Sequence, residues 1–226
     1  MHIPDGFLNG ATMAVTAAAS TGGLGIALKA AGKKLGERQV PLMGMTAAFI
    51  FAAQMLNFPV LAGTSGHLIG AALAAILLGP WASIVIMSLV LIIQCFIFQD
   101  GGLLSLGANL FNMAVLAGPA AYIIYRTLGR ILGDGSRARM ISGFVAAWFS
   151  VVLAAVACSM ELAASGTAPL RTVLPAMAGI YALIGVGEGL ATMALLKLVK
   201  SVNGRWSTGF EPSITCPNPA AYDFPK

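Results

Sequence analysis

The sequence predicts an all-α integral membrane protein with about seven transmembrane helices. Its composition is the first observation behind this prediction, because 58% of its 226 residues are hydrophobic and only 9% are charged. A soluble domain carries about 25% charged residues, and the mean hydropathy of this chain is +0.87. The composition is therefore typical of a chain whose surface faces lipid.

The second observation is the spacing of the apolar windows. They place seven spans at residues 10–30, 40–58, 67–78, 81–98, 103–125, 140–159 and 170–196. All but the third approach or exceed the ~20 residues that cross the hydrocarbon core. The third is short and suits a half-helix that opens into a polar cavity. These spans use nearly every residue, so we expect one transmembrane domain over residues 1–200, a polar tail over 201–226 and no soluble enzyme module.

The third observation is the distribution of the thirteen basic residues, which predicts the orientation. Twelve of them fall on one side of the predicted bundle: between spans one and two, between spans five and six, and after span seven. Arg171 is the exception. Because basic loops stay in the cytoplasm, we expect the amino terminus outside and the tail inside. The net charge of +5 reflects this bias, and we expect no nucleic-acid partner.

Span one is dominated by small residues over positions 11–23. In lipid, small side chains let helix backbones approach closely, since dispersion contacts drive helix association there. Two interpretations stay open: packing of this span within the bundle, or docking of a separate membrane subunit.

The amino terminus carries the most specific chemistry and reads Met1-His2-Ile3-Pro4-Asp5-Gly6-Phe7-Leu8. The α-amine of Met1, the backbone nitrogen of His2 and one imidazole nitrogen of His2 can bind one metal ion through a five-membered and a six-membered chelate ring. The amine has an ordinary pKa of about 7.7–8.0, so a metal can displace its proton at neutral pH. Loss of the amide proton favours Ni(II) and Cu(II).

A histidine after the initiator Met can also be an accident. Two observations favour the metal site here. The stretch from Ile3 to Gly6 predicts a rigid turn, with Pro4 fixing its φ angle, and this turn would fold the terminus back. The chain has two histidines, and the second, His67, ends the glycine-rich stretch of residues 63–67.

Polar side chains gather at the same predicted depth as the amino terminus. They are Thr64, Ser65, Gln94, Asp100, Asn109 and Asn112. Each can serve a hydrogen bond between helices, but their shared depth favours a pocket in the outer half of the bundle. Glu188 is different, because it lies in the inner half of span seven between two glycines, and the sequence names no partner for it.

Several stretches together resemble a known family. They are residues 1–8, the loop 63–67, Leu78-Gly79-Pro80-Trp81, Gly101-Gly102, Leu106-Gly107-Ala108-Asn109 and Phe111-Asn112-Met113. They look like the CbiM/NikM family, the substrate-capture subunits (S components) of energy-coupling-factor (ECF) transporters for cobalt and nickel. The resemblance runs from Met1 to about Leu196.

The resemblance implies that the amino-terminal segment folds into the bundle and that Met1, His2 and His67 hold Co²⁺ or Ni²⁺ as the transported substrate, without an organic cofactor. It implies a transmembrane coupling (T) subunit, two ATPase subunits and a small accessory membrane subunit as partners in a prokaryotic cell membrane. The metal would serve cobalamin synthesis or nickel enzymes. One departure is His67-Leu68-Ile69-Gly70, where some members carry His-Pro-Thr-Gly.

Two alternatives remain. Gly63-Thr64-Ser65-Gly66 matches the motif of rhomboid intramembrane serine proteases, but the base would have to be His67, two residues from Ser65. A stand-alone secondary metal transporter needs ionisable groups along its path, and in the predicted spans Glu188 is the deep one. The sequence has no Gly-x-x-x-x-Gly-Lys-Ser/Thr motif, so we expect a partner to hydrolyse ATP.

Overall fold

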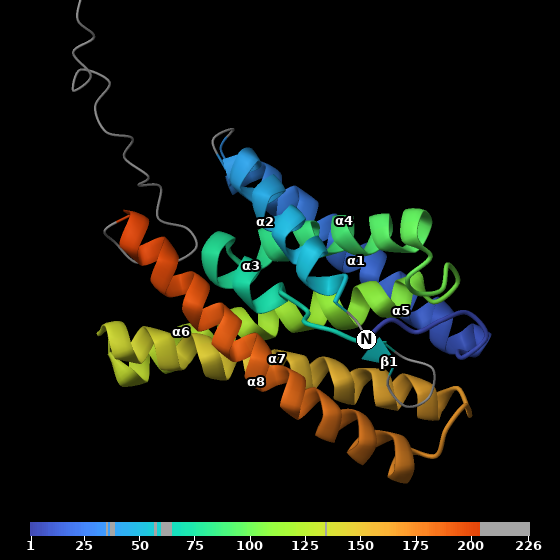
Figure 1. The fold of residues 1–226 in the computed structure, drawn as a ribbon. Coiled ribbons are helices and arrows are strands. Elements are labelled where there is room, and N and C mark those ends of the chain that lie inside the picture. Colours follow the sequence, from blue (N-terminus) through green and yellow to red (C-terminus); the bar gives the residue numbers. More distant parts are fainter. Residues whose placement is uncertain (35, 37–38, 57, 60–64, 134, 204–226) are drawn as a thin grey trace, which may run out of the picture.

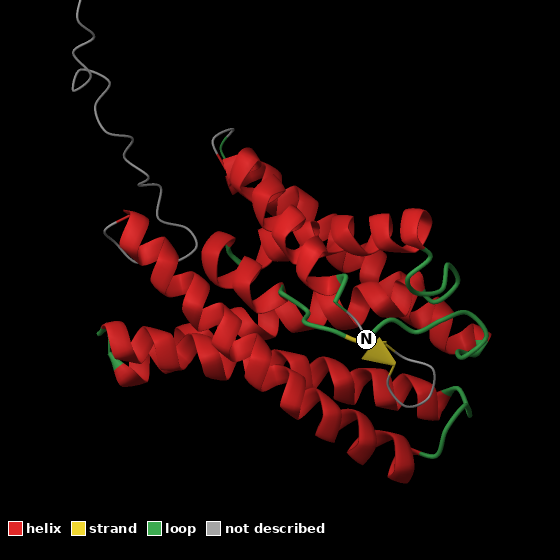
Figure 2. Ribbon diagram, viewed as in Figure 1, coloured by secondary structure: helices red, strands yellow, loops and turns green. Residues whose placement is uncertain are grey.

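The computed structural model describes residues 1–34, 36, 39–56, 58–59, 65–133 and 135–203. Within these ranges the regular secondary structure is helical apart from one pair of two-residue strands, and loops join the elements (Figure 2). The predicted tail of residues 201–226 lies outside the described residues from residue 204 onward.

The elements follow one another along the chain without large insertions. They are α1 (Gly10–Lys34), α2 (Val40–Gln54), β1 (Phe58–Pro59), β2 (Ser65–Gly66), α3 (Ala71–Leu78), α4 (Pro80–Phe98), α5 (Leu106–Leu110), the π-helical turn η3 (Phe111–Leu116), α6 (Ala117–Leu132), α7 (Ser136–Ala164) and α8 (Leu170–Asn203). Because α5, η3 and α6 are contiguous, they form one long helix. β1 and β2 pair antiparallel.

The predicted fold class, an all-α membrane protein, is confirmed. In the described part of the chain, five helices are long and apolar enough to cross a membrane: α1, α4, the α5–α6 helix, α7 and α8. α2, with 15 residues, is apolar but shorter. The number of crossings and the orientation stay predictions.

The second helix ends earlier than predicted, and the third begins later than predicted. Span two was expected to reach residue 58, but α2 ends at Gln54 and Phe58 pairs with Gly66 in the strand pair. Span three was expected to begin at His67, but α3 begins at Ala71. Gly70 has a left-handed backbone with φ 79°, which an α-helix cannot contain. His67 therefore lies in a loop.

The sixth predicted span is also longer than expected. α7 continues to Ala164, five residues beyond the predicted end at 159, and so includes Glu161. α7 lies beside α8 along much of its length (Figure 1). Gly185 and Gly189 of α8 allow this contact, because a Cβ there would lie 2.9 Å from Trp148 and 2.5 Å from Phe144.

One face of α1 packs against the α5–α6 helix. Ser20 donates a hydrogen bond from its Oγ to the carbonyl oxygen of Gly107 over 2.5 Å, and a Cβ on Gly107 would lie 2.6 Å from the Cα of Ala17. Packing of span one within the bundle is therefore correct for this face. Its other face stays exposed, with Val15 69% and Ile26 59% exposed.

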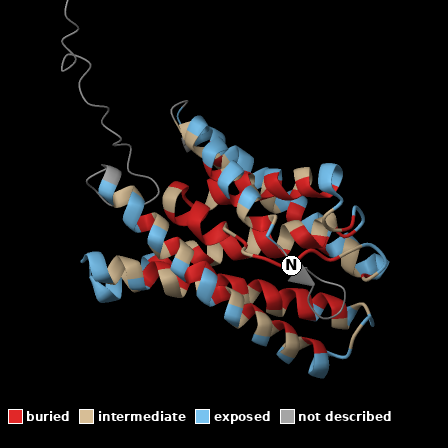
Figure 3. Ribbon diagram, in the orientation of Figure 1, coloured by how far each residue is buried: buried red, intermediate tan, exposed pale blue. Residues whose placement is uncertain are grey.

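The core holds the start of the chain as well as helix interiors. Figure 3 shows buried segments along the inside of the bundle and exposed ones along its outside. Met1 and Ile3 are both 0% exposed and belong to the same cluster as side chains of α4, α7 and α8. An amino terminus is usually frayed, so its burial here requires specific contacts.

Candidate metal centre

The free amine of Met1 lies inside the bundle. Figure 1 marks the amino terminus in the middle of the molecule beside β1. The Met1 nitrogen lies 2.5 Å from Nε2 of His67. His2 and His67 are 3% and 1% exposed. The structure thus brings together the three residues that the sequence and the family resemblance named as ligands.

His67 presents a lone pair to this amine. Its Nδ1 lies 2.7 Å from the carbonyl oxygen of Leu68. A carbonyl oxygen can only accept a hydrogen bond, so Nδ1 carries the proton and donates it. The other nitrogen, Nε2, is then the one with a free electron pair, and the Met1 amine donates to it.

The imidazole of His2 stacks on that of His67. Their ring centroids are 4.7 Å apart and their planes differ by 24°. Nδ1 of His2 faces the Asp100 carboxylate, with 3.1 Å to Oδ1. Asp100 follows the end of α4, where Gln99 adopts a left-handed backbone with φ 55°. This turn places the carboxylate over the amino terminus.

The segment after His2 is held by the α5 end of the long helix. The amide of Ile3 donates to Oδ1 of Asn109 over 2.8 Å, and Nδ2 of Asn109 donates back to the Ile3 carbonyl over 3.2 Å. The Gly102 amide donates to that same carbonyl over 2.9 Å. Asn109 therefore acts on the backbone of the terminal segment.

Asp5 fixes the same segment from its other side. Its carboxylate accepts backbone N–H groups of Leu103, Leu104 and Ser105 over 3.0, 2.8 and 3.2 Å. These bonds satisfy backbone donors of the turn that precedes α5. Ser105 returns a hydrogen bond from its Oγ to the Pro4 carbonyl over 3.1 Å. The predicted turn of residues 3–6 is thus docked on the turn that precedes α5.

Gly101 and Gly102 make this docking sterically possible. Gly101 has φ 90°, and a Cβ there would lie 2.9 Å from Nδ2 of Asn109. A Cβ on Gly102 would overlap the backbone and carboxylate of Asp5. Side chains at these two positions would displace the terminal segment.

The loop that carries His67 is held by α2 and α8. Gln54 donates from Nε2 to the Ile69 carbonyl over 2.6 Å. The Glu188 carboxylate accepts the Ile69 amide over 2.8 Å and the Gly70 amide over 2.5 Å. The structure therefore supplies the partner of Glu188 that the sequence could not name.

The remaining polar residues of the expected pocket do not all line one site. Gln94 is fully buried in α4, and its side chain raises the pKa of the His2 imidazole. Asn112 donates instead to the Glu161 carboxylate over 2.7 Å. Thr64 and the side chain of Ser65 lie outside the described residues.

Glu161 is a buried carboxyl that the sequence reasoning missed. Its exposed fraction is 8%, so the expectation that Glu188 was the deep ionisable group in the spans was wrong. The prediction failed because it ended the sixth span at residue 159. Asn112, three residues from Asn109, was the available signal that this face needed a polar partner.

Burial sets the electrostatics of the three candidate ligands. It lowers the pKa of the Met1 amine from 8.0 to about 4, while Cys158 and Asp100 act in the opposite direction. It also lowers the pKa of His67 well below its ordinary value, and that of His2 despite the hydrogen bond with Asp100. An ammonium or imidazolium would lose its hydration here. The three groups are therefore neutral at pH 7, with electron pairs available.

The fold and the site together define a class of protein. The fold is that of a multi-pass helical membrane protein, and neutral nitrogen donors gathered in a buried site are suited to a late first-row transition metal.

Comparisons with known proteins identify the family. The family model described as CbiM, the cobalt uptake substrate-specific transmembrane region, matches residues 2–206. The fused nickel transport protein NikMN of Rhodobacter capsulatus is 37% identical over 198 residues, which are 88% of this chain and 56% of that protein. The cobalt transport protein CbiM of Kyrpidia tusciae is 30% identical over 208 residues, covering 88% of this chain and 83% of that protein.

A comparison with solved structures also finds a transition metal transporter. The crystal structure of a truncated transition metal transporter superposes with a TM-score of 0.81 at 35% identity, over 89% of this chain and 99% of that one. The chain belongs to the CbiM family, as the sequence resemblance indicated, and is a membrane component of transition-metal uptake. It spans 65% of the length of a relative from Archaeoglobus fulgidus that is 39% identical over 201 residues.

Proposed function

We propose that the chain captures Ni(II) or Co(II) with four nitrogens: the Met1 amine, the His2 amide nitrogen, one His2 imidazole nitrogen and Nε2 of His67. The observation that carries this proposal is the 2.5 Å distance between the Met1 nitrogen and Nε2 of His67. With metal–nitrogen bonds of about 2.0 Å, two nitrogens at a right angle lie about 2.8 Å apart. An ion bound by both therefore needs only a small movement of either.

The chelate chemistry fixes where each ligand lies. Amine, amide and imidazole are successive ligands of Met1 and His2, so His67 takes the position opposite the amide and beside the other two. The stacked imidazoles of His2 and His67, with centroids 4.7 Å apart, support a position of His67 beside the His2 imidazole. The six-membered ring can form only through Nδ1 of His2, which faces Asp100 at 3.1 Å. Binding therefore exchanges this contact for a bond to the metal.

The substrate is a metal that tolerates planar nitrogen ligation. Such ligation favours Ni(II) and Cu(II), with Co(II) weaker in the general order of affinities. Relatives carry nickel and cobalt in their names. We therefore assign Ni(II) or Co(II) as the imported ion and assign no organic cofactor to its capture.

Import requires partners. The matching family is a substrate-specific region, and that description fits one subunit of a larger transporter. We assign the chain to an ECF importer with a coupling subunit and two ATPase subunits in a prokaryotic cell membrane. The exposed face of α1 leaves room for a small accessory membrane subunit.

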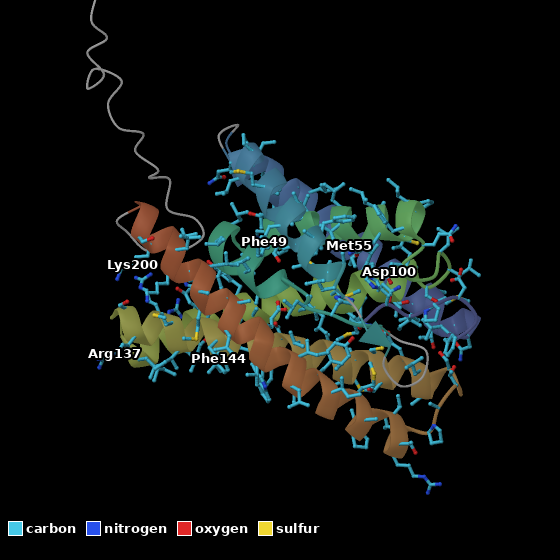
Figure 4. The ribbon with its side chains drawn as sticks, viewed as in Figure 1. Phe49, Met55, Asp100, Arg137, Phe144 and Lys200 are labelled. Carbon is cyan, nitrogen blue, oxygen red and sulfur yellow. The ribbon has the colours of Figure 1, made fainter. Side chains whose placement is uncertain are left out.

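The orientation follows from the two ends of the bundle. Figure 4 shows Arg137 and Lys200 toward one end of the molecule and Asp100 toward the other. Basic residues favour the cytoplasmic side, so we assign the amino terminus and its buried site to the outer half of the bundle. This is the side from which an importer takes its substrate.

The two alternatives have less support. In a serine protease, His67 would have to accept a proton from Ser65, but both of its ring nitrogens are already engaged, with Met1 and with Leu68. In a secondary transporter, Glu188 would have to exchange with the substrate, but it is bound to the backbone of Ile69 and Gly70.

Replacement of His67 tests the site. His67→Gln keeps the side-chain volume and an acceptor for the Met1 amine but removes the imidazole nitrogen. We expect its affinity for Ni(II) and Co(II) to fall by more than the 10- to 100-fold that residues supporting a ligand typically cost. Isothermal titration of purified protein measures this, with circular dichroism as the check on folding. If His67→Gln binds both ions as the parent does, the site is assigned wrongly.

A further inference from the structure

Glu188 is a buried carboxylate on α8 whose two oxygens both serve one short loop. Oε2 accepts the Ile69 amide over 2.8 Å, and Oε1 accepts the Gly70 amide over 2.5 Å. The residue is 3% exposed. α8 contacts β2, where this loop begins. A long transmembrane helix is thereby tied to residues two and three positions after His67.

The backbone of the loop is shaped to meet this carboxylate. Gly70 has φ 79°, and a Cβ there would lie 2.8 Å from Ile50 of α2, so glycine is required on both grounds. Its left-handed conformation starts α3 and presents successive amides of Ile69 and Gly70 to α8. Gln54 of α2 holds the opposite side of the Ile69 residue through its carbonyl. The loop is therefore clamped between α2 and α8.

The clamp reaches His67 through one more bond. Nδ1 of His67 donates to the carbonyl oxygen of Leu68, which is the residue between His67 and the clamped Ile69. This bond fixes the ring orientation and the tautomer, and so directs Nε2 at the Met1 amine. Partners of this kind hold metal-binding imidazoles in place and raise their basicity.

We propose, on the basis of the four-nitrogen site above, that Glu188 is a positioning residue that holds His67 in its metal-binding orientation and couples that orientation to α8. Coupling of this kind is reciprocal. Metal binding stabilises the contact between Glu188 and the loop. A displacement of α8 that breaks this contact loosens His67 and lowers the affinity for the metal.

Glu161 provides a matched control. It is the other buried carboxyl described in the spanning helices, it lies on the neighbouring helix α7, and it accepts a hydrogen bond from Asn112. The bonds of the His67 loop described above do not involve it. Glu161→Gln therefore removes a buried carboxylate of the same size without touching the clamp.

The test compares Glu188→Gln, Glu188→Asp and Glu161→Gln with the parent in detergent. Glu188→Gln keeps one acceptor oxygen and turns an NH₂ group toward the second amide. Glu188→Asp keeps the charge but shortens the reach by one methylene. Three quantities are measured: the Ni(II) affinity, the visible absorption of the nickel-loaded protein, which reports planar ligation, and the hydrogen exchange of the Ile69 and Gly70 amides.

Both Glu188 variants should lose about 10- to 100-fold in Ni(II) affinity, change the nickel absorption and exchange the two amides faster. Glu161→Gln should keep the parent's values in all three. A merely structural role for Glu188 would lower thermal stability and leave the affinity and spectrum of the folded fraction unchanged, and that result would overturn the proposal. Failure of the parent itself to bind Ni(II) would instead refute the proposed function.

Discussion

At the scale of single residues, burial turns an ordinary chain start into a neutral nitrogen donor. The Met1 amine lies where an ammonium would be poorly solvated, and its pKa falls from 8.0 to about 4. His67 carries its proton on Nδ1, toward the Leu68 carbonyl, and so leaves Nε2 to the amine. At neutral pH, both groups are therefore uncharged and have an electron pair available for a metal.

This protonation state predicts how metal binding depends on pH. At pH 7 the buried amine has no proton to lose, so nickel has to displace only the amide proton of His2. We expect about one proton released per nickel and an affinity that falls about tenfold per unit of acidification between about pH 6.5 and 7.5. Titration calorimetry in buffers of different ionisation enthalpy counts the protons.

An amine with its ordinary pKa would give a different result. It would be charged at pH 7, because its folded pKa would lie above that pH. Nickel would then release about two protons, and the affinity would fall about a hundredfold per pH unit. That count would contradict the buried, neutral amine.

The sequence could name Met1, His2 and His67 as candidate ligands because chelation by Met1 and His2 is local chemistry. The choice of His67 required only a count of histidines and a family resemblance. The partners of the carboxyl groups were not predictable. Glu188 meets a loop about 120 residues earlier in the chain, and no periodicity encodes such a contact. Glu161 was missed because the sixth predicted span ended at residue 159, before Glu161.

At the scale of elements, the terminal segment and the turn before α5 form one unit. Ile3, Asp5 and Asn109 exchange hydrogen bonds with backbone across this contact, and Gly101 and Gly102 leave room for it. The sequence indicated a turn at residues 3–6 and a special glycine pair. It could not show that they meet, because the contact depends on how α1 and α4 pack.

Gly102→Ala tests this unit. The added Cβ would overlap Asp5, so the terminal segment should shift and the Ni(II) affinity should fall about 10- to 100-fold. Gly22→Ala is the matched control, because a Cβ on Gly22 of α1 meets nothing within 4 Å. Titration of both variants decides the point. Equal affinities would show that the metal does not require the docked segment.

At the scale of the whole molecule, the bundle has a basic end and an end that holds the amino terminus. Arg137 and Lys200 lie toward the first and Asp100 toward the second (Figure 4). The sequence predicted the class of fold from composition and this polarity from the distribution of the basic residues. It misjudged where α2 ends and where α3 begins, because the left-handed Gly70 and the strand pair interrupt an otherwise apolar pattern.

Labelling tests the orientation of the bundle. A cysteine at Leu104, which is 65% exposed between α4 and α5, should react with an impermeant maleimide in intact cells. A cysteine at the exposed Ser136, at the start of α7, should react only after permeabilisation. The background carries Cys216→Ser, since Cys95 and Cys158 are buried. The reverse pattern would place the metal site in the cytoplasm and rule out capture from outside.

The central claim is that the free amine of Met1 binds the metal. We expect the large residue His2 to protect Met1 from removal. Addition of Gly-Ser ahead of Met1 leaves every side chain in place but converts the amine into an amide and moves the new terminal amine away from His67.

Isothermal titration of the native and the extended protein with Ni(II) tests this claim most directly. The native protein should bind tightly, and the extended protein should lose nearly all of its affinity, as should a protein acetylated at Met1. Equal affinities of the native and extended proteins would contradict the claim and leave a site made by the side chains of His2 and His67 alone.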